Sequence, residues 1–173
     1  AKEKYERSKV HINIGDINYI KVDNNNNDII ISNIKPLLSS INDNSYMTGL
    51  IVGVRKNSNY NVNIAEINFM NCNIAIGDKI QIIDKLPNGN DFKTICGYDN
   101  SSVVKGDGLI DLNLNSNDRY FIVIPIYYDE LLIVNECVIK FKINVNGEEK
   151  SFYLKDYTFY QPNNEIIEKN NIY

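Results

Sequence analysis

The chain has 173 residues and a formal net charge of -4, and 43% of its residues are hydrophobic. This length is enough for one domain with its own core, without support from a metal or a disulfide. The acidic balance and the lack of a basic cluster argue against nucleic-acid binding, which requires a positive surface. No apolar run reaches the ~18 residues of a membrane helix, so we expect no membrane contact.

The N-terminal sequence AKEKYERSK lacks the apolar stretch of a signal peptide. Because the sequence begins at Ala1 rather than Met, we expect a processed or trimmed fragment, from which a targeting segment could have been removed. The compartment is therefore not predicted from these residues.

Period-two alternation of apolar and polar residues recurs along the chain and predicts strands with one buried face. In chain order the predicted strands are residues 11–14, 19–22, 28–34, 50–54, 79–86, 91–98, 107–115, 120–126, 136–145 and 151–160. Residues 59–73 alternate weakly and fit either a strand or a loose turn. The strand from residue 28 is expected to end near Lys35-Pro36, because proline cannot donate to a ladder, and residues 37–45 are expected to be irregular.

Several connections between the strands are predicted from residues that favour turns, namely asparagine, proline and glycine. The asparagine run 24–27 predicts a solvated insertion. Residues 87–90, which include Pro87 and Gly89, predict a hairpin between 79–86 and 91–98. Asn146-Gly147 predicts a type I′ turn between the last two strands, the first of which is the clearest in the sequence.

Seven to ten short strands separated by turns favour an all-β, immunoglobulin-like antiparallel sandwich, since a parallel sheet would need helices between its strands. We expect a single domain over residues 1–173, with 1–9 and 161–173 peripheral or frayed.

Cys72, Cys96 and Cys137 are widely spaced, and His11 is the one histidine, so a zinc site is not expected. Two interpretations remain open for these cysteines: buried free thiols in strands, or one disulfide with a thiol left over.

No set of residues forms a convincing catalytic centre, so we predict that the protein is not an enzyme and uses neither cofactor nor metal. A nucleophile and base pair would have to use His11, near the terminus. The segment from Lys105 to Gly108 is not a phosphate-binding loop, because a strand and not a helix follows it. The carboxylate pairs Asp129-Glu130 and Glu148-Glu149 are typical of solvated charges.

Three segments then remain, in a fixed order along the chain. They are Ser45, Tyr46, Met47, Thr48, Gly49 and Leu50 before a strand; Gly106, Asp107, Gly108 and Leu109 before an alternating strand; and Tyr127, Tyr128, Asp129 and Glu130 after an apolar strand. Glycine permits a partner to approach the backbone closely, and tyrosine buries a large area with few rotatable bonds. These segments are therefore the candidate binding loops.

This order resembles the chagasin family of inhibitors of papain-like cysteine peptidases, whose sandwich carries an NPTTG[FY] loop, a GxGG loop and an RPW loop. Thr48 and Gly49 match the final Thr-Gly of the first motif, with Leu50 in its aromatic position. Gly106 and Gly108 match the second motif, but Leu109 replaces its last glycine, and the third motif is absent. The composition is most similar to the falstatin-type inhibitors of malaria parasites.

The resemblance implies a monomer that reversibly and non-covalently inhibits cathepsin L-like peptidases, in a secreted or vesicular setting. Thr48-Gly49 would lie at a loop tip over the catalytic cysteine, with the other two loops on either side. Gly49→Glu would then weaken inhibition without unfolding the domain. The alternative is an immunoglobulin-like adhesion or surface binding module without inhibitory activity.

Overall fold

A computed structural model describes residues 9–11, 18–21, 28–41, 44–89, 91–99, 102–115, 118–128 and 134–160, which form strands and one short helix. The strands are β1 (Lys9–His11), β2 (Asn18–Lys21), β3 (Asp28–Ile41), β4 (Asn44–Asn57), β5 (Val62–Met70), β6 (Ile74–Ile76), β7 (Gln81–Ile83), β8 (Leu109–Leu114), β9 (Tyr120–Tyr128), β10 (Val134–Val145) and β11 (Glu148–Tyr160). The helix is α2 (Phe92–Cys96).

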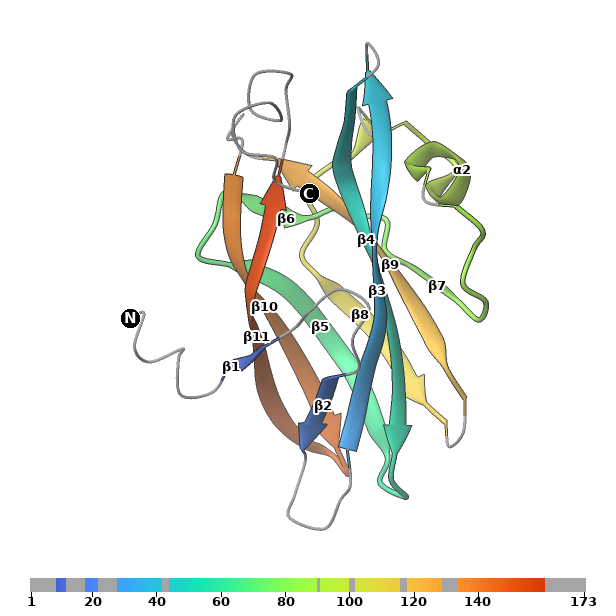
Figure 1. The fold of residues 1–173 in the computed structure, drawn as a ribbon. Coiled ribbons are helices and arrows are strands. Elements are labelled where there is room, and N and C mark those ends of the chain that lie inside the picture. Colours follow the sequence, from blue (N-terminus) through green and yellow to red (C-terminus); the bar gives the residue numbers. More distant parts are fainter. Residues whose placement is uncertain are drawn as a thin grey trace.

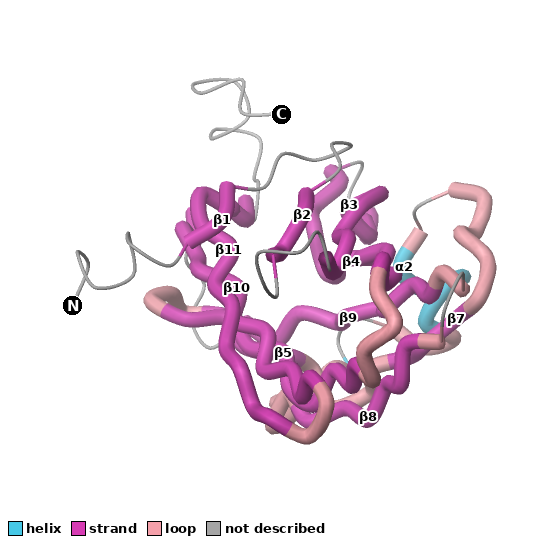
Figure 2. The backbone as a smooth tube through the Cα atoms, turned by 90° about the horizontal axis from the view of Figure 1, so that it is seen from below, coloured by secondary structure: helices cyan, strands magenta, loops and turns pink. Residues whose placement is uncertain are grey.

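The strands form two sheets that face each other (Figures 1 and 2). One sheet has the order β1-β11-β10-β5-β8, and the other has β2-β3-β4-β9-β6, with β7 also paired to β9. All pairs between named strands are antiparallel except β1 with β11. The predicted all-β, mainly antiparallel sandwich is confirmed.

The main core lies between the sheets and is built from alternate residues of the central strands. In β10, Phe141, Ile143 and Val145 are buried, while Lys140 and Lys142 are partly exposed. This alternation follows the sequence pattern, because successive side chains of a strand point to opposite faces of the sheet. The predicted turn after β10 is also confirmed, since Asn146 and Gly147 have φ of 51° and 83°.

Strands β3 and β4 are longer than the sequence predicts, and the expected end at Lys35-Pro36 is wrong. Pro36 lies within β3, opposite Leu50 of β4. The β3–β4 register shifts on both sides of this proline, between Ser32 and Lys35 and between Leu37 and Leu38. Such irregularities let a strand pass a residue that has no N–H to donate. Residues 37–41 and 44–45 are therefore strand, and the prediction of an irregular segment there is also wrong.

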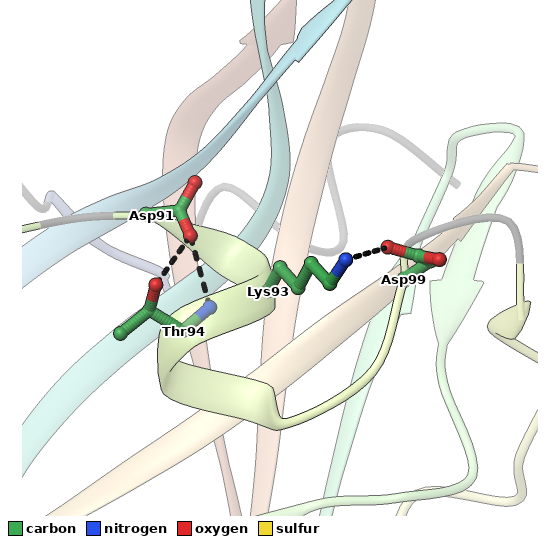
Figure 3. A network of polar contacts seen from close by, with 4 residues as sticks. All are labelled: Asp91, Lys93, Thr94 and Asp99. Atoms are coloured by element: carbon green, nitrogen blue, oxygen red, sulfur yellow. Dashed lines mark hydrogen bonds and ion pairs between the residues drawn. The ribbon is translucent and has the colours of Figure 1, made fainter.

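The predicted hairpin partner at 91–98 is instead helical. The Asp91 carboxylate accepts hydrogen bonds from the backbone N–H and the hydroxyl of Thr94 at 2.9 and 2.7 Å (Figure 3). Gly97 ends the helix with φ of 78°. These are the usual caps of a helix. Phe92 and Cys96, four residues apart, are buried on one face of it. No helix in the described ranges is long and apolar enough to cross a bilayer.

Of the two interpretations of the cysteines, the structure bears out the disulfide with one thiol left over. Cys72, just after β5, is joined to Cys137 of β10, with a Cα–Cα distance of 5.3 Å. Cys96 is the free and buried cysteine. The bond closes a sequence separation of 65 residues within one sheet.

Candidate functional site

The upper part of the β3–β4 hairpin extends beyond the rest of its sheet (Figure 1). The last β4–β9 pair is Gly49 with Pro125, whereas β3 and β4 remain paired as far as Ile41 and Asn44. We call the paired residues 38–41 and 44–47 the projecting ribbon. It carries Ser45, Tyr46 and Met47 of the first predicted segment, opposite Ser40, Ser39 and Leu38 respectively.

Thr48 and Gly49 do not lie at a loop tip, so that expectation is wrong. Both are buried within β4 at the base of the projecting ribbon, where the register shifts by one residue, and Thr48 is only 2% exposed. A Cβ atom at Gly49 would lie 2.9 Å from Leu37 Cδ1 and 3.0 Å from the Ile124 carbonyl oxygen. The glycine is thus needed for packing within the sheet, which leaves no room there for a partner. Leu50 is likewise buried in the main core.

The third segment begins at the end of β9, at the same end of the sandwich as the projecting ribbon. β9 runs antiparallel to β4, so Tyr127 and Tyr128, which follow Pro125, lie just beyond the level of Gly49. Tyr128 packs against the main core, while Tyr127 is partly exposed and lies opposite Ala75 of β6. Asp129 and Glu130 lie outside the described residues.

The second segment crosses from one sheet to the other. The Gly106 N–H donates to the Ile76 carbonyl at 2.8 Å, and the Ile67 N–H donates to the Gly108 carbonyl at 2.9 Å. A Cβ at Gly106 would lie 2.7 Å from the Asp78 Cα, and Gly108 has φ of 75°. Both glycines therefore serve close backbone approach.

Of the other two residues of this segment, Asp107 is exposed and accepts a hydrogen bond from the Leu109 N–H at 3.0 Å. Leu109 is 63% exposed, the largest value among the exposed apolar side chains of the described residues. Leu109 is thus the residue of this segment that offers apolar surface to a partner.

The sheet register relates the first and second segments. Gly49 lies opposite Pro125, the Gly77 N–H donates to the Pro125 carbonyl, and Gly77 forms a bridge with Lys105. The second segment is therefore level with the base of the projecting ribbon, about 14 Å from it across three strand spacings. The described parts of the three segments lie toward one end of the sandwich, and among them the ribbon projects beyond it.

The described residues hold no group of three or more His, Cys, Asp or Glu side chains arranged to bind a metal. Burial raises the pKa of the Cys96 thiol to about 11, so this thiol keeps its proton at neutral pH. A catalytic or redox cysteine needs a lowered pKa, and Cys96 has the opposite.

The sequence did not reveal a basic depression on the outer face of the β4-containing sheet. Its lining includes Arg55, Lys85 and Arg119, from three separate parts of the chain. No local motif joins these residues, and only the strand pairing brings them together. That these like charges lie at neighbouring strand positions can be recognised only once the strand register is known.

No protein-family model matches the chain, and no curated protein matches its sequence. Among solved structures, the chain is similar to the GAE domain of GGA2p from Saccharomyces cerevisiae, with 9% sequence identity and a TM-score of 0.25. The match covers 86% of this chain and 98% of the yeast domain.

Proposed function

We propose that the chain is a reversible, non-covalent inhibitor of papain-like cysteine peptidases, and that the projecting ribbon enters the active-site cleft. The observation that carries this proposal is the ribbon itself, which extends past the last β4–β9 pair and bears Tyr46 and Met47. A narrow two-stranded wedge on a rigid sandwich suits a cleft between two walls of an enzyme.

The proposed mechanism is exclusion of substrate without chemistry by the inhibitor. The ribbon is paired along its length before contact, so binding orders few new residues and loses little conformational entropy. An interface of standard size, about 800 Å² on each partner, is then enough for tight binding. Tyr127 and the exposed Leu109 would contact the walls of the cleft beside the ribbon.

Burial changes the roles proposed for the first segment. Tyr46 and Met47 become the proposed contacts, while Thr48 and Gly49 hold the base of the ribbon against β9. In the third segment, Tyr127 becomes the proposed anchor, because Tyr128 packs against the core.

The test is peptide hydrolysis by papain or a cathepsin L-like peptidase at increasing concentrations of the purified domain. We expect competitive inhibition at nanomolar to micromolar concentrations, weakened at least about tenfold by Tyr46→Ala, the size of effect expected for an anchor residue. The control is Glu148→Ala, at the exposed start of β11, next to the Asn146-Gly147 turn at the opposite end of the sandwich. Undiminished hydrolysis at about 10 μM domain would reject the proposal.

The second candidate is an adhesion or surface binding module that uses a sheet edge. The supporting observation is that β8, an edge strand of its sheet, presents the exposed Leu109. This candidate predicts that the domain binds a protein partner whether or not Tyr46 is replaced, and that substitutions along β8 abolish binding. The Tyr46→Ala variant thus separates the two candidates.

A further inference from the structure

Three cationic side chains lie in one row across three neighbouring strands. β4 and β9 pair Val54 with Tyr120, so continuing the register by one residue places Arg55 beside Arg119. β7 and β9 pair Ile83 with Phe121, and continuing that register by two residues places Lys85 on the other side of Arg119. Neighbouring strands are about 4.8 Å apart, so the backbone positions that carry these three side chains lie close together.

All three belong to the outer face of the sheet. Along β9, Phe121 and Val123 pack with Phe92 of α2 in a second, smaller core, whereas Ile122 and Ile124 belong to the main core. Arg119 is two residues before Phe121 and therefore shares its face. The same alternation from Ile51 puts Arg55 on this face of β4.

A surface depression lies at this row, beyond the part of the face that α2 covers. Its lining residues are Arg55, Asp84, Lys85, Leu86, Arg119 and Phe121. Phe121 is 5% exposed and Leu86 is 41% exposed, so one supplies a buried apolar floor and the other an accessible apolar rim. Three cations and one carboxylate give this lining a net charge of two positive.

Arg55, Lys85 and Arg119 form no ion pair with another described residue. The ion pairs among the described residues join other side chains, namely Lys93 with Asp99 and Lys142 with Glu66 and Glu149. Arg55 Nε is buried and has no hydrogen-bond acceptor among the described residues. Like charges at directly opposite strand positions repel, and a buried donor without an acceptor is unfavourable. One anion held between the side chains would relieve the charge repulsion.

We propose that this depression binds a tetrahedral dianion, a phosphate or sulfate group, between Arg55, Lys85 and Arg119. Guanidinium groups present several N–H donors in a plane and bind such oxyanions through paired, charge-assisted hydrogen bonds. The dianion matches the net charge of the lining. The site lies near the end of β4 remote from the projecting ribbon, so it is independent of peptidase binding.

The test is a titration with sodium sulfate and sodium phosphate at constant ionic strength, followed by the backbone amide signals of the ¹⁵N-labelled domain. Chloride replaces the dianion in the reference samples, so general screening is constant. We expect saturable shifts centred on Arg55, Arg119 and Phe121, with millimolar or tighter affinity. Absence of saturable shifts up to about 50 mM of either dianion would overturn the proposal.

Matched variants separate a built site from general charge attraction. Arg119→Gln and Lys93→Gln each remove one exposed positive charge, but only Arg119 lines the depression. We expect Arg119→Gln to weaken dianion binding at least fivefold and Lys93→Gln to leave it unchanged. Equal weakening by both variants would contradict the site, since it would mean that net charge alone attracts the anion.

A second arm distinguishes a free ion from an ester. Leu86 would contact the organic part of a phosphate monoester, so phenyl phosphate is compared with inorganic phosphate. Tighter binding of phenyl phosphate that is lost in Leu86→Ala identifies a monoester as the ligand class. Equal binding of the two probes, with the Arg119→Gln effect intact, supports the free dianion.

Discussion

At the scale of single residues, close packing explains the glycines of Thr48-Gly49 and of Gly106-Asp107-Gly108. Gly49 lets β3 and β9 approach β4 from both sides, and Gly106 lets the crossing segment lie against Asp78. In the sequence these glycines resemble residues of a binding loop. The atoms that exclude a side chain at these positions belong to segments distant in the chain, so only the fold reveals them. The proposed contacts in these segments are therefore the apolar and aromatic residues Tyr46, Leu109 and Tyr127.

Substitution of Gly49 is expected to destabilise the fold, in contrast to the sequence-based expectation for Gly49→Glu. A methyl group at 2.9 Å from Leu37 and 3.0 Å from a backbone oxygen must displace β3 or β9. Gly49→Ala should lower the free energy of unfolding by about 1–3 kcal/mol, as overpacking usually does. Gly49→Glu should be worse, because it also buries a charge. Urea unfolding measures both, with the exposed Ser151→Ala as the control, and unchanged stability of Gly49→Ala would contradict this packing.

Tyr98 is a second residue whose environment makes a prediction. Its ring packs edge-on to Phe92 at 5.5 Å and under Lys79 Nζ at 4.6 Å, but its hydroxyl is buried without a hydrogen-bond partner among the described residues. Tyr98→Phe keeps both ring contacts and removes the unsatisfied hydroxyl. We expect the variant to be as stable as the wild type or more stable by about 1 kcal/mol at pH 7.

The same residue gives a pH dependence. Burial, followed by the nearby Cys96 and Asp78, raises the pKa of Tyr98 to about 12, above the ordinary value of 10. The folded state therefore holds this proton more tightly than the unfolded state, and the associated stability is present below pH 10 and lost as the pH rises from 10 to 12. Thermal unfolding across this range should decline more steeply for the wild type than for Tyr98→Phe. Parallel curves would show that the hydroxyl is not buried as described.

At the scale of elements, the predictions succeeded where local pattern decides and failed where distant contacts do. The alternation of β10 and the Asn146-Gly147 turn are set by neighbouring residues, and both were predictable. The continuation of β3 through Pro36 depends on compensating register shifts against β4, which no local rule contains.

α2 had local signals, the Asp91 cap and Gly97, but its five residues are too few for helical periodicity to stand out. The four-residue spacing of Phe92 and Cys96 becomes decisive only once a sheet face lies beneath them. A search for capping residues, rather than for periodicity alone, would have identified this helix.

The cap of α2 can be tested through its free cysteine. The hydrogen bonds from the Thr94 hydroxyl and N–H hold the pKa of Asp91 below its ordinary value of 3.8, so the cap stabilises the helix above that pH and is lost as the pH falls through the folded-state pKa. Asp91→Ala should fray the helix and speed labelling of Cys96 by a thiol reagent at pH 7, while Asp91→Asn keeps a capping oxygen and should label more slowly than Asp91→Ala. Identical labelling rates would exclude a role for the cap.

At the scale of the whole molecule, the disulfide fixes how the segment after β5 meets β10. Reduction, or the double variant Cys72→Ser and Cys137→Ser, removes the cross-link between two positions 65 residues apart in the chain. A loop of that length corresponds to about 4 kcal/mol of stability in the chain-entropy account. Denaturant unfolding with and without a reducing agent should show a loss of this order, with no further loss on reduction of the double variant. Equal stability in both conditions would contradict a formed disulfide.

The candidate site was predictable only in part for the same whole-molecule reason. The order of the three segments along the chain was visible in the sequence, and the register brings them toward one end of the sandwich. Which residues of each segment are free to face a partner depends on where β4 separates from β9. That point is set by the pairing of Gly49 with Pro125, which are 76 residues apart in the chain.

The central claim is that the ribbon end of the sandwich binds in the cleft of a papain-like peptidase. Its most direct test is the change in the amide signals of the ¹⁵N-labelled domain on adding papain whose catalytic cysteine has been methylated. If the ribbon end enters the cleft, the signals of residues 44–47 and 107–109 and of Tyr127 broaden or shift, while those of the turn at Asn146 and Gly147 stay unchanged. Changes confined to that turn, or no change with a saturating excess of the enzyme, would contradict it.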